Sequence, residues 1–377
     1  MRAMRPSLRV AIIGTGMIAA AHARAARDAG ATVLGVLGSS PSSSAAAAAT
    51  WGIPSGFQDL DELLLSRPDV VHVCSPNSTH LSYGRAIAEA GIHLVVEKPI
   101  ATTLHDAQLL EEAVREAGVV ATVPFAYRFH PLVREMRERR RRGDIGDVIL
   151  LHGSYLQDWL LSPDVSNWRA DASVGGSSRA FADIGSHWCD LAEFISGERF
   201  ASLQATFSIV HPTRSAASSE SFSSSGAAAA RVSVDTEDIA LLTLRSDRGV
   251  HASVTISQVS AGRKNRLWIE VDGTRQSLVF DQEQPESLWI GTPDGARIIR
   301  RGEGTPSADQ HRLLRTPPGH PQGWPDAFAA FCADTYAAVR GEDPEGLPTL
   351  EDGVRSMRLI DAALESVRSR EWKDVIR

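Results

Sequence analysis

The spacing of apolar and polar residues follows two different patterns along this chain of 377 residues. Over its first third, short apolar runs alternate with stretches whose apolar residues recur at helical spacing, which is typical of buried parallel strands separated by helices. The expected strands cover 8–13, 31–37, 70–74, 92–96 and 119–123, and the expected helices cover 20–29, 81–90 and 103–117. The pattern predicts a doubly wound α/β domain that ends near residue 125.

From about residue 146 the pattern changes to strand-like runs with turn residues between them and few helices. The expected strands cover 148–159, 202–210, 239–245, 250–259, 267–271 and 277–280. Helical spacing returns over 324–339 and 350–367, and the last helix is placed to pack back on the body of the protein. The fold class is therefore α/β, with domain one over residues 1–125 and a second domain over 126–377 built on a mainly antiparallel sheet. The serine- and alanine-rich stretch 211–230 is expected to be a mobile loop.

The turn after the first strand reads Gly14-Thr15-Gly16-Met17-Ile18-Ala19 and opens the first helix. This order of strand, glycine-rich turn and helix is the context that a dinucleotide fingerprint requires. Gly14 allows the tight turn, Gly16 lets the backbone approach a pyrophosphate, and Ala19 permits close packing of helix on strand. The first domain is therefore expected to be a Rossmann domain, with cofactor contacts from Gly14, Gly16, Met17 and Ile18.

The end of the second strand reads Leu37-Gly38-Ser39-Ser40 and bears on the choice of nicotinamide cofactor. A carboxylate there would bind the ribose 2′-hydroxyl of NAD, but the chain has no Asp or Glu between Asp28 and Asp59. No arginine stands there to bind a 2′-phosphate either. Ser39 and Ser40 can donate hydrogen bonds to that phosphate, so the cofactor is NAD(P), with a lean to NADP.

Two further strands end in polar residues at the edge where open α/β sheets bind ligands. One is followed by Ser75-Pro76-Asn77 and His80, and the other by Glu97-Lys98-Pro99. Ser75, Asn77, His80, Glu97 and Lys98 are therefore expected to lie near the cofactor. Turn capping is an alternative for Asn77 and His80, and Lys98 taken alone is a charge that closes a strand.

A second cluster of polar residues lies at Asp183-Ile184-Gly185-Ser186-His187. A helix from Asp183 buries a stripe, and His187 lies beside that stripe, one turn from Asp183. The stripe consists of Ile184, Trp188, Leu191 and Ile195. A core histidine with Asp183 as helix N-cap is the alternative. One histidine and one aspartate provide too few ligands for a metal ion, so no metal site is expected.

Composition excludes several classes of protein. A formal charge of −7 and a pI near 6.0 argue against nucleic acid, and the arginines of 134–142 alternate with glutamates as on a solvated helix face. Three cysteines without CxxC spacing favour a reducing compartment over disulfides or zinc. The N-terminal arginines and apolar stretch imitate a signal peptide, but cleavage would destroy the glycine turn, so a cytoplasmic protein with an intact N-terminus is expected. No apolar run is long enough to span a membrane.

These motifs together resemble those of the Gfo/Idh/MocA oxidoreductase family, in the family's order and over both domains. Besides the glycine turn, Glu97-Lys98-Pro99 and Asp183-x-Gly-x-His187, they include Tyr127-Arg128-Phe129-His130-Pro131. The resemblance implies an NAD(P)-dependent dehydrogenase or reductase acting on sugars, inositols or related polyols. It also implies an open C-terminal sheet that forms a homodimer or homotetramer, and catalytic roles for Lys98, Asp183 and His187.

Within that family, Tyr155-Leu156-Gln157-Asp158-Trp159 and Asn167-Trp168-Arg169 look similar to the branch that contains levoglucosan dehydrogenase. Ala126 departs from the asparagine of many members, and Ser177-Ser178-Arg179 departs from their glycine-rich continuation. The first departure concerns a cofactor contact of the family, and the second concerns the shape of the substrate site.

The chemistry of these side chains suits oxidation of a secondary alcohol. His187 is the candidate base for the hydroxyl proton, Lys98 would stabilise charge on the reacting oxygen, and Asp183 would orient the imidazole or a neighbouring hydroxyl. Candidate substrate residues are Tyr127, Gln157, Trp159, Trp168, Arg169 and His320, with core packing as the alternative for both tryptophans. Two other functions stay open: a glycosidase that oxidises its sugar transiently with a bound NAD, and a nucleotide-binding sensor without turnover.

Overall fold

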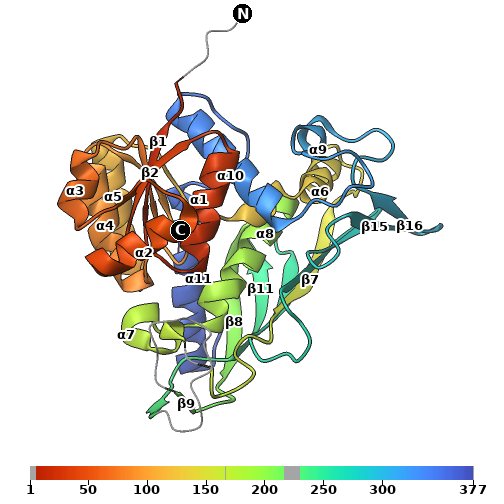
Figure 1. Ribbon diagram of the computed structural model, residues 1–377. Helices are drawn as coiled ribbons and strands as arrows, with labels where there is room; N and C mark the ends of the chain where they lie inside the picture. The colour runs from red at the N-terminus through yellow and green to blue at the C-terminus, as the bar shows by residue number, and fades with distance from the viewer. Residues whose placement is uncertain (1–5, 166, 216–229, 377) are drawn as a thin grey trace, which may run out of the picture. The chain divides into compact units, whose positions relative to one another are not determined.

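The computed structural model describes residues 6–165, 167–215 and 230–376 (Figure 1). The chain divides into two compact units, of which the first comprises residues 1–124 and 328–354 and the second comprises 125–327 and 355–377. The division near residue 125 separates the two patterns of apolar residues found in the sequence. Residues 328–354, which the sequence analysis assigned to the second domain, group with the first unit.

The first unit is built on a six-stranded parallel sheet with the strand order β3-β2-β1-β4-β5-β6. Its strands are β1 Arg9–Ile13, β2 Thr32–Leu37, β3 Ser55–Gly56, β4 Val70–Val73, β5 His93–Val96 and β6 Ala121–Thr122. Nearly every residue of β1, β4 and β5 is buried, as expected for strands with helices on both faces. The order reverses between β1 and β4, so the switch point for ligand binding lies at their carboxyl ends.

The helices of this unit follow the strands in alternation, in the red and orange colours of Figure 1. They are α1 Met17–Asp28, α2 Pro41–Trp51, α3 Leu60–Leu65, α4 His80–Glu89 and α5 Leu104–Ala117. The sequence analysis placed α1, α4 and α5 and missed α2 and α3. The alanine-rich α2 has no polar face, so periodicity could not reveal it.

Part of α10 (Trp324–Val339) and the start of α11 (Leu350–Ser369) complete the first unit. Thr335 of α10 contacts Thr122 of β6 through their hydroxyls at 3.1 Å, and Tyr336 bonds His72 of β4. Gly353 of α11 lies so close to Ile100 and Val123 that a Cβ would meet their methyl groups at 2.7 and 2.9 Å. These contacts lie across more than 200 residues of sequence, which is why local pattern could not assign this segment.

The second unit holds a nine-stranded sheet with the order β16-β15-β14-β13-β7-β12-β11-β8-β17. All neighbours pair antiparallel except β7 and β12, which are parallel. The strands are β7 Val148–Leu156, β8 Phe200–Ser208, β11 Ile239–Ser246, β12 His251–Ser257, β13 Arg266–Gly273, β14 Ser277–Asp281, β15 Ser287–Thr292, β16 Gly295–Arg300 and β17 Lys373–Asp374. The mainly antiparallel sheet is confirmed, and β15, β16 and β17 were not foreseen.

One face of this sheet is covered by helices, among them α8 Ser186–Ser196, which Figure 1 shows running along it. Trp188 of α8 donates its indole N–H to the carbonyl of Trp268 at 3.1 Å. Gly153 of β7 makes room for that ring, since a Cβ there would lie 2.5 Å from the indole nitrogen. The unit also contains α6 Pro131–Arg141, α7 Ala172–Gly175, α9 Ala308–Arg312 and residues 355–369 of α11.

The expectation that 134–142 is a solvated helix face is wrong for its first turn. Arg134 is fully buried on α6, where its guanidinium lies over the rings of Phe129 and Phe194 and its Nη1 reaches Asp309 at 3.3 Å. Arg139 to Arg142 are half-buried or exposed. Arg139 pairs with Glu135 one turn away, and Arg141 and Arg142 pair with Glu138. A buried arginine partnered by aromatic rings and a distant aspartate looks, in sequence, like any other arginine of a charged helix.

The serine- and alanine-rich stretch is described only at its ends. Residues 213–215 (β9) and 231–233 (β10) pair antiparallel, whereas 216–229, on which the mobile-loop prediction falls, lie outside the described residues. Among the described helices, none combines the length and the apolar character that a membrane crossing needs.

Candidate active site

The glycine turn between β1 and α1 is shaped for close approach of a ligand to the backbone. Gly14 has φ +111°, and a Cβ at this position would lie 2.6 Å from the carbonyl oxygen of Cys74, so no other residue fits. Gly16 is the N-cap of α1, and a Cβ there would meet no atom within 4 Å. Met17 is 68% exposed on the first turn, next to the half-buried Ile18. The turn thus leaves open space at a helix N-terminus, which fits a dinucleotide pyrophosphate.

The end of β2 leads directly into α2, and its serines are partly engaged by the protein itself. Ser40 is the N-cap of α2, and its Oγ accepts the backbone N–H of Ser43 at 3.2 Å. Ser39 is exposed and precedes this cap. No acidic residue lies in the first turn of α2, so the positive end of the helix dipole faces no fixed negative charge there.

The loops after β4 and β5 are tied together by His80. Its Nδ1 contacts the carbonyl oxygen of Pro99 at 2.9 Å, and its Nε2 contacts that of Ser75 at 2.8 Å. The hydroxyls of Ser75 and Thr79 lie 2.6 Å apart, and Asn77 is buried at the start of the short turn that leads into α4. His80 therefore has a structural role in joining two ligand-edge loops, and the cofactor contacts of Ser75, Asn77 and His80 stay predictions.

Lys98 follows β5 at the carboxyl edge of the parallel sheet, as the sequence predicted. Its side chain is half-buried, its bond to Pro99 is cis, and its backbone N–H donates to Oε2 of Glu97 at 3.0 Å. Glu97 is itself buried. The loop thus places Lys98 at the carboxyl edge of the parallel sheet, after the strand that neighbours β4.

In the second unit, Asp183 and His187 lie on one continuous helical segment. Asp183 is in a π-helical turn, Phe181–Gly185, which continues into α8, where His187 is the second residue. The predicted stripe of Ile184, Trp188, Leu191 and Ile195 is buried throughout. Asp183 is not an N-cap, because the helical segment begins two residues before it. π-helical turns concentrate at functional sites, since they re-aim side chains.

The carboxylate of Asp183 is held by two side chains. Gln258, which follows β12, donates its Nε2–H to Oδ2 at 2.9 Å, and Nε of Arg169 lies 3.5 Å from Oδ1. The Arg169 guanidinium also stacks over the Trp168 ring, 4.4 Å from its centroid. Three predicted site residues, Trp168, Arg169 and Asp183, therefore lie together.

His187 is enclosed by aromatic rings. Phe125 and Tyr127 meet it edge-on, with ring centroids at 5.6 and 5.0 Å, and the Tyr155 centroid lies at 6.4 Å. Burial raises the pKa of Tyr127, and it raises that of Tyr155 well above its ordinary value, with a smaller contribution from Tyr127. Both phenols are neutral near pH 7, so neither can act as a base there, and the base role of His187 stays a prediction.

A hydrogen-bonded group supports this aromatic enclosure. Asn265, which precedes β13, donates to the Tyr127 hydroxyl at 3.1 Å and accepts at 2.7 Å from both Tyr155 and Gln157. Tyr155 and Gln157 share the buried face, whereas Asp158 points away and pairs with Lys264 at 2.7 Å. Gln157 was predicted as a substrate residue, whereas Asn265 was not predicted, because it belongs to no motif.

Trp159 and His320 are the remaining two predicted substrate residues. Trp159 is half-buried just after β7. His320 is exposed in a loop whose carbonyl at 320 accepts from Arg301 at 2.7 Å. Substrate contacts by either residue stay predictions.

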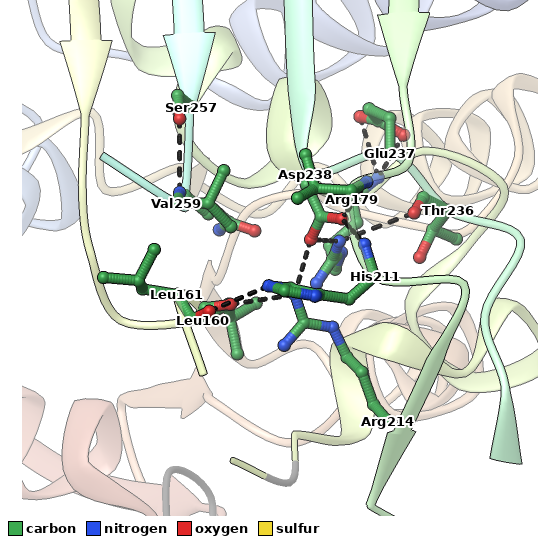
Figure 2. Close-up of polar contacts among 12 residues, drawn as sticks. Leu160, Leu161, Arg179, His211, Arg214, Thr236, Glu237, Asp238, Ser257 and Val259 are labelled. Carbon is green, nitrogen blue, oxygen red and sulfur yellow. Dashed lines mark hydrogen bonds and ion pairs between the residues drawn. The ribbon is translucent and has the colours of Figure 1, made fainter. Parts of the chain in front are cut away.

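The start of the helix that carries Asp183 is anchored by two buried carboxylates, drawn in Figure 2. Glu237 accepts the backbone N–H groups of Arg179 and Phe181 and the hydroxyl of Ser178. Burial raises the pKa of Glu237, and these donors oppose the rise only in part. No sequence signal marks Glu237, since a carboxylate before a strand is common.

Asp238 lies between two buried guanidinium groups (Figure 2). Its Oδ1 bonds Nη2 of Arg179 and, at 2.6 Å, Nη2 of Arg214, while Oδ2 accepts the N–H of Val210 and of His211 at 2.7 and 3.1 Å. Burial favours the neutral acid, but the two arginines and the N–H of His211 lower the pKa of Asp238 below its usual range. Asp238 is therefore an anion that fixes the position of Arg179.

His152, Glu270 and Asp272 form a separate half-buried cluster in the same unit, with one potential ligand atom from each residue all within 4.8 Å. His152 and Glu270 are cross-strand partners on β7 and β13, and Nε2 of His152 lies 3.5 and 3.7 Å from the two carboxylates. Cross-strand contacts of this kind are common on a sheet surface, and the expectation that the chain has no metal site stays a prediction.

Comparison with known proteins agrees with this geometry. The family model described as an oxidoreductase family with an NAD-binding Rossmann fold matches residues 8–125, and the GFO/IDH/MocA C-terminal domain model matches 133–279. The chain belongs to the GFO/IDH/MocA oxidoreductase family. The resemblance found in the sequence is thus confirmed, together with the fold class.

Relatives within the family include sugar and polyol dehydrogenases. Levoglucosan dehydrogenase of Pseudarthrobacter phenanthrenivorans is 30% identical over 353 residues, which are 89% of this chain and 87% of that protein. A levoglucosan dehydrogenase structure in complex with NADH and L-sorbose matches with TM-score 0.89 at 28% identity, covering 98% of this chain and 99% of the other. An inositol dehydrogenase homologue from Azotobacter vinelandii, complexed with NAD+, matches with TM-score 0.83 at 26% identity, covering 99% and 98%.

Proposed function

We propose that the protein oxidises a secondary hydroxyl of a sugar, anhydrosugar or inositol to a ketone, and reduces the ketone in the reverse direction, with a nicotinamide nucleotide as hydride carrier. Family membership and the named activities of the relatives support the reaction class. The observation that carries the proposal is His187, a histidine enclosed by aromatic rings on the same helical segment as an anchored carboxylate, Asp183.

In this mechanism His187 accepts the proton of the substrate hydroxyl that is oxidised. Lys98 donates a hydrogen bond to the reacting oxygen and stabilises the negative charge that develops there. Asp183, held by Gln258 and Arg169, orients the imidazole or a substrate hydroxyl. Bound nucleotide supplies the hydride chemistry, and the chain positions the sugar and moves the proton.

Aromatic and polar side chains around Asp183 suit a sugar. Trp168 offers a ring face for C–H groups, and the Arg169 guanidinium stacked on it offers donors for hydroxyl oxygens. Tyr127, Gln157 and Trp159 complete the proposed binding set, with His320 as an outer contact. A neutral, hydroxyl-rich ligand matches this mixture of donors, acceptors and ring faces.

For the cofactor, we propose a preference for NADP over NAD. The exposed Ser39 and the N-terminus of α2, which has no acidic first turn, suit a 2′-phosphate and lack the carboxylate that repels it. The variant Ser39→Asp introduces that carboxylate at an exposed position. It is expected to shift the ratio of kcat/KM for NADP to NAD toward NAD by at least about tenfold. An unchanged ratio would contradict the preference.

The uncovered face of the large sheet is proposed to join copies of the chain into a homodimer or homotetramer. Leu241 and Ile298 are 49% and 65% exposed on this sheet, and Trp268 and Trp289 are half-buried. Sedimentation of the purified protein tests it, because a monomer at micromolar concentration would exclude such an interface. Three buried free cysteines fit the proposed cytoplasmic location, which fractionation of the source cells would test.

The reaction is tested by nicotinamide absorbance across sugars, anhydrosugars and inositols with NAD and NADP. The wild type is expected to reduce nucleotide with at least one of them. Lys98→Ala and His187→Ala are expected to lower kcat about 10²- to 10⁴-fold while nucleotide binding persists.

Three results would contradict the proposal. Full turnover by both variants would exclude the mechanism. Glycoside cleavage without net nucleotide turnover would indicate a glycosidase, and nucleotide binding without turnover of any sugar or polyol would indicate a sensor.

A further inference from the structure

A chain of buried polar side chains lies behind the loop that carries Lys98, entirely within the first unit. It runs from Tyr336 of α10 to His72 of β4, then to His22 of α1, and ends at Glu97 after β5. The contacts measure 3.0 Å from Tyr336 Oη to His72 Nε2, 2.8 Å between the two Nδ1 atoms, and 3.0 Å from His22 Nε2 to Glu97 Oε1. Tyr336, His72 and His22 have no exposed surface. Of these four residues, only Glu97 was predicted from the sequence to lie near the cofactor.

The acceptor at one end determines how the protons are placed along this chain. An ionised Glu97 only accepts, so His22 donates from Nε2. When Nδ1 of His22 accepts, His72 donates from its own Nδ1 and accepts from Tyr336 at Nε2. Burial, and then the neighbouring His22, hold the pKa of His72 well below its ordinary value, so His72 stays neutral. Each of the three contacts then contains one donated proton, and every donor is directed along the series toward Glu97.

Glu97 connects this series of hydrogen bonds to the backbone of Lys98. While Oε1 accepts from His22, Oε2 accepts the backbone N–H of Lys98 at 3.0 Å. On the other side of the lysine, His80 contacts the carbonyl oxygen of Pro99 at 2.9 Å. The backbone of Lys98 is therefore held from both sides, and the side from Glu97 depends on the direction of one carboxylate.

We infer that His22 and His72 are positioning residues for Lys98: together with Tyr336 they hold the Glu97 carboxylate in the orientation that fixes the Lys98 backbone and aims its ammonium group. Apolar side chains would fill this space without desolvating four polar groups, so packing alone does not account for the chain. The inference rests on the catalytic role of Lys98 in the proposed function.

A direct test follows Lys98 itself by NMR, because the chain has only three lysines, at positions 98, 264 and 373. Protein grown with [15N]lysine gives three backbone amide signals, and those of Lys264 and Lys373 serve as internal references. In Glu97→Gln, the introduced side-chain amide cannot accept from both His22 and Lys98 without turning a donor toward one of them. The Lys98 signal is expected to shift and to lose hydrogen-exchange protection at least about tenfold.

The histidine step is tested by a conservative pair of variants. His22→Leu removes the donor to Glu97, and the Lys98 signal is expected to change as in Glu97→Gln. His22→Gln keeps an N–H donor at the ε position and is expected to retain most of the wild-type Lys98 signal. Thr335→Val is the matched control: it breaks a buried hydroxyl contact with Thr122 on the same helix as Tyr336, outside the chain. It is expected to leave the Lys98 signal and kcat unchanged.

Kinetics with the best substrate from the screen give the second readout. Glu97→Gln and His22→Leu are expected to lower kcat about 10- to 100-fold with the KM for nucleotide within about threefold, as small misplacement of a catalytic group does. His22→Gln is expected to recover most of that loss.

Unchanged Lys98 signals in both Glu97→Gln and His22→Leu would overturn the inference, as would equal loss in Thr335→Val. Full turnover by Lys98→Ala, with the Lys98 signal still dependent on His22, would overturn the proposed function and leave the positioning contact established.

Discussion

Two buried polar clusters stand behind the two halves of the proposed catalytic set, and they are built on opposite principles. In the first unit, His22 and His72 pass hydrogen bonds from Tyr336 to a single carboxylate. In the second, Arg179 and Arg214 clamp Asp238, with Glu237 beside them (Figure 2). Directional hydrogen bonds orient Glu97 in the first cluster, and attraction between opposite charges fixes the position of Arg179 in the second.

This difference determines what the removal of one residue does to each cluster. Removing a member of a neutral chain leaves one unsatisfied polar group, whereas removing the anion between two guanidiniums leaves like charges buried side by side. The charge cluster is therefore expected to be critical for the stability of its unit, and the histidine chain for the aim of one side chain.

The largest stability effect is expected for Asp238→Asn, which leaves two buried guanidinium groups without their shared anion. The free energy of unfolding should fall by about 3–5 kcal/mol in a denaturant titration. Asp164→Asn, which breaks the exposed pair with Arg231, should cost less than about 1 kcal/mol. Similar losses of unfolding free energy in the two variants would contradict the critical role of the buried Asp238 cluster in stability.

His130 is a buried histidine that belongs to neither cluster, so it provides a third case for the comparison. Burial lowers its pKa to about 4, and among the described residues its Nε2 has no hydrogen-bond partner. A histidine with a depressed pKa binds fewer protons in the folded state, so its stabilising contribution is present near pH 7 and is lost as the pH falls from about 6.5 toward 4.

The unfolding free energy of the wild type between pH 7 and pH 4.5 should therefore include a loss of about 2 kcal/mol that His130→Leu lacks. Chemical denaturation of both proteins at the two pH values measures it. The same acid sensitivity in the variant would show that His130 is not its source.

The smallest effect is expected for Tyr336→Phe, which deletes the terminal donor of the histidine chain. About 1 kcal/mol of unfolding free energy should be lost, because His72 keeps its remaining partner and loses only one neutral hydrogen bond. A loss as large as that of Asp238→Asn would mean that the chain carries buried charge.

Where the sequence predicted the fold correctly, the signals were local. Gly14 needs a positive φ next to Cys74, and the buried stripe from Ile184 to Ile195 follows helical spacing, so each is visible within a few residues. The helix predicted over 103–117 is α5, Leu104–Ala117, with Thr103 as its N-cap.

What the sequence could not reveal depends on contacts across the chain. Asn265 meets Tyr127 over 138 residues, and Gln258 meets Asp183 over 75. An amide side chain of this kind gains its role only when the sheet brings strands together, and no spacing rule marks it. The burial of Arg134 was misjudged for the same reason, since its partner Asp309 lies 175 residues away.

The assignment of residues 328–354 to the first unit has a consequence for synthesis on the ribosome. The sheet of that unit is complete by residue 122, yet the partner of His72 is made 264 residues after it. Because domains otherwise fold from the N-terminus as they emerge, the nucleotide-binding half must wait for nearly the whole chain before its last helix can dock. The proposed catalytic lysine is among the early parts of the protein to be made, whereas Tyr336, at the far end of its hydrogen-bonded support, is made much later.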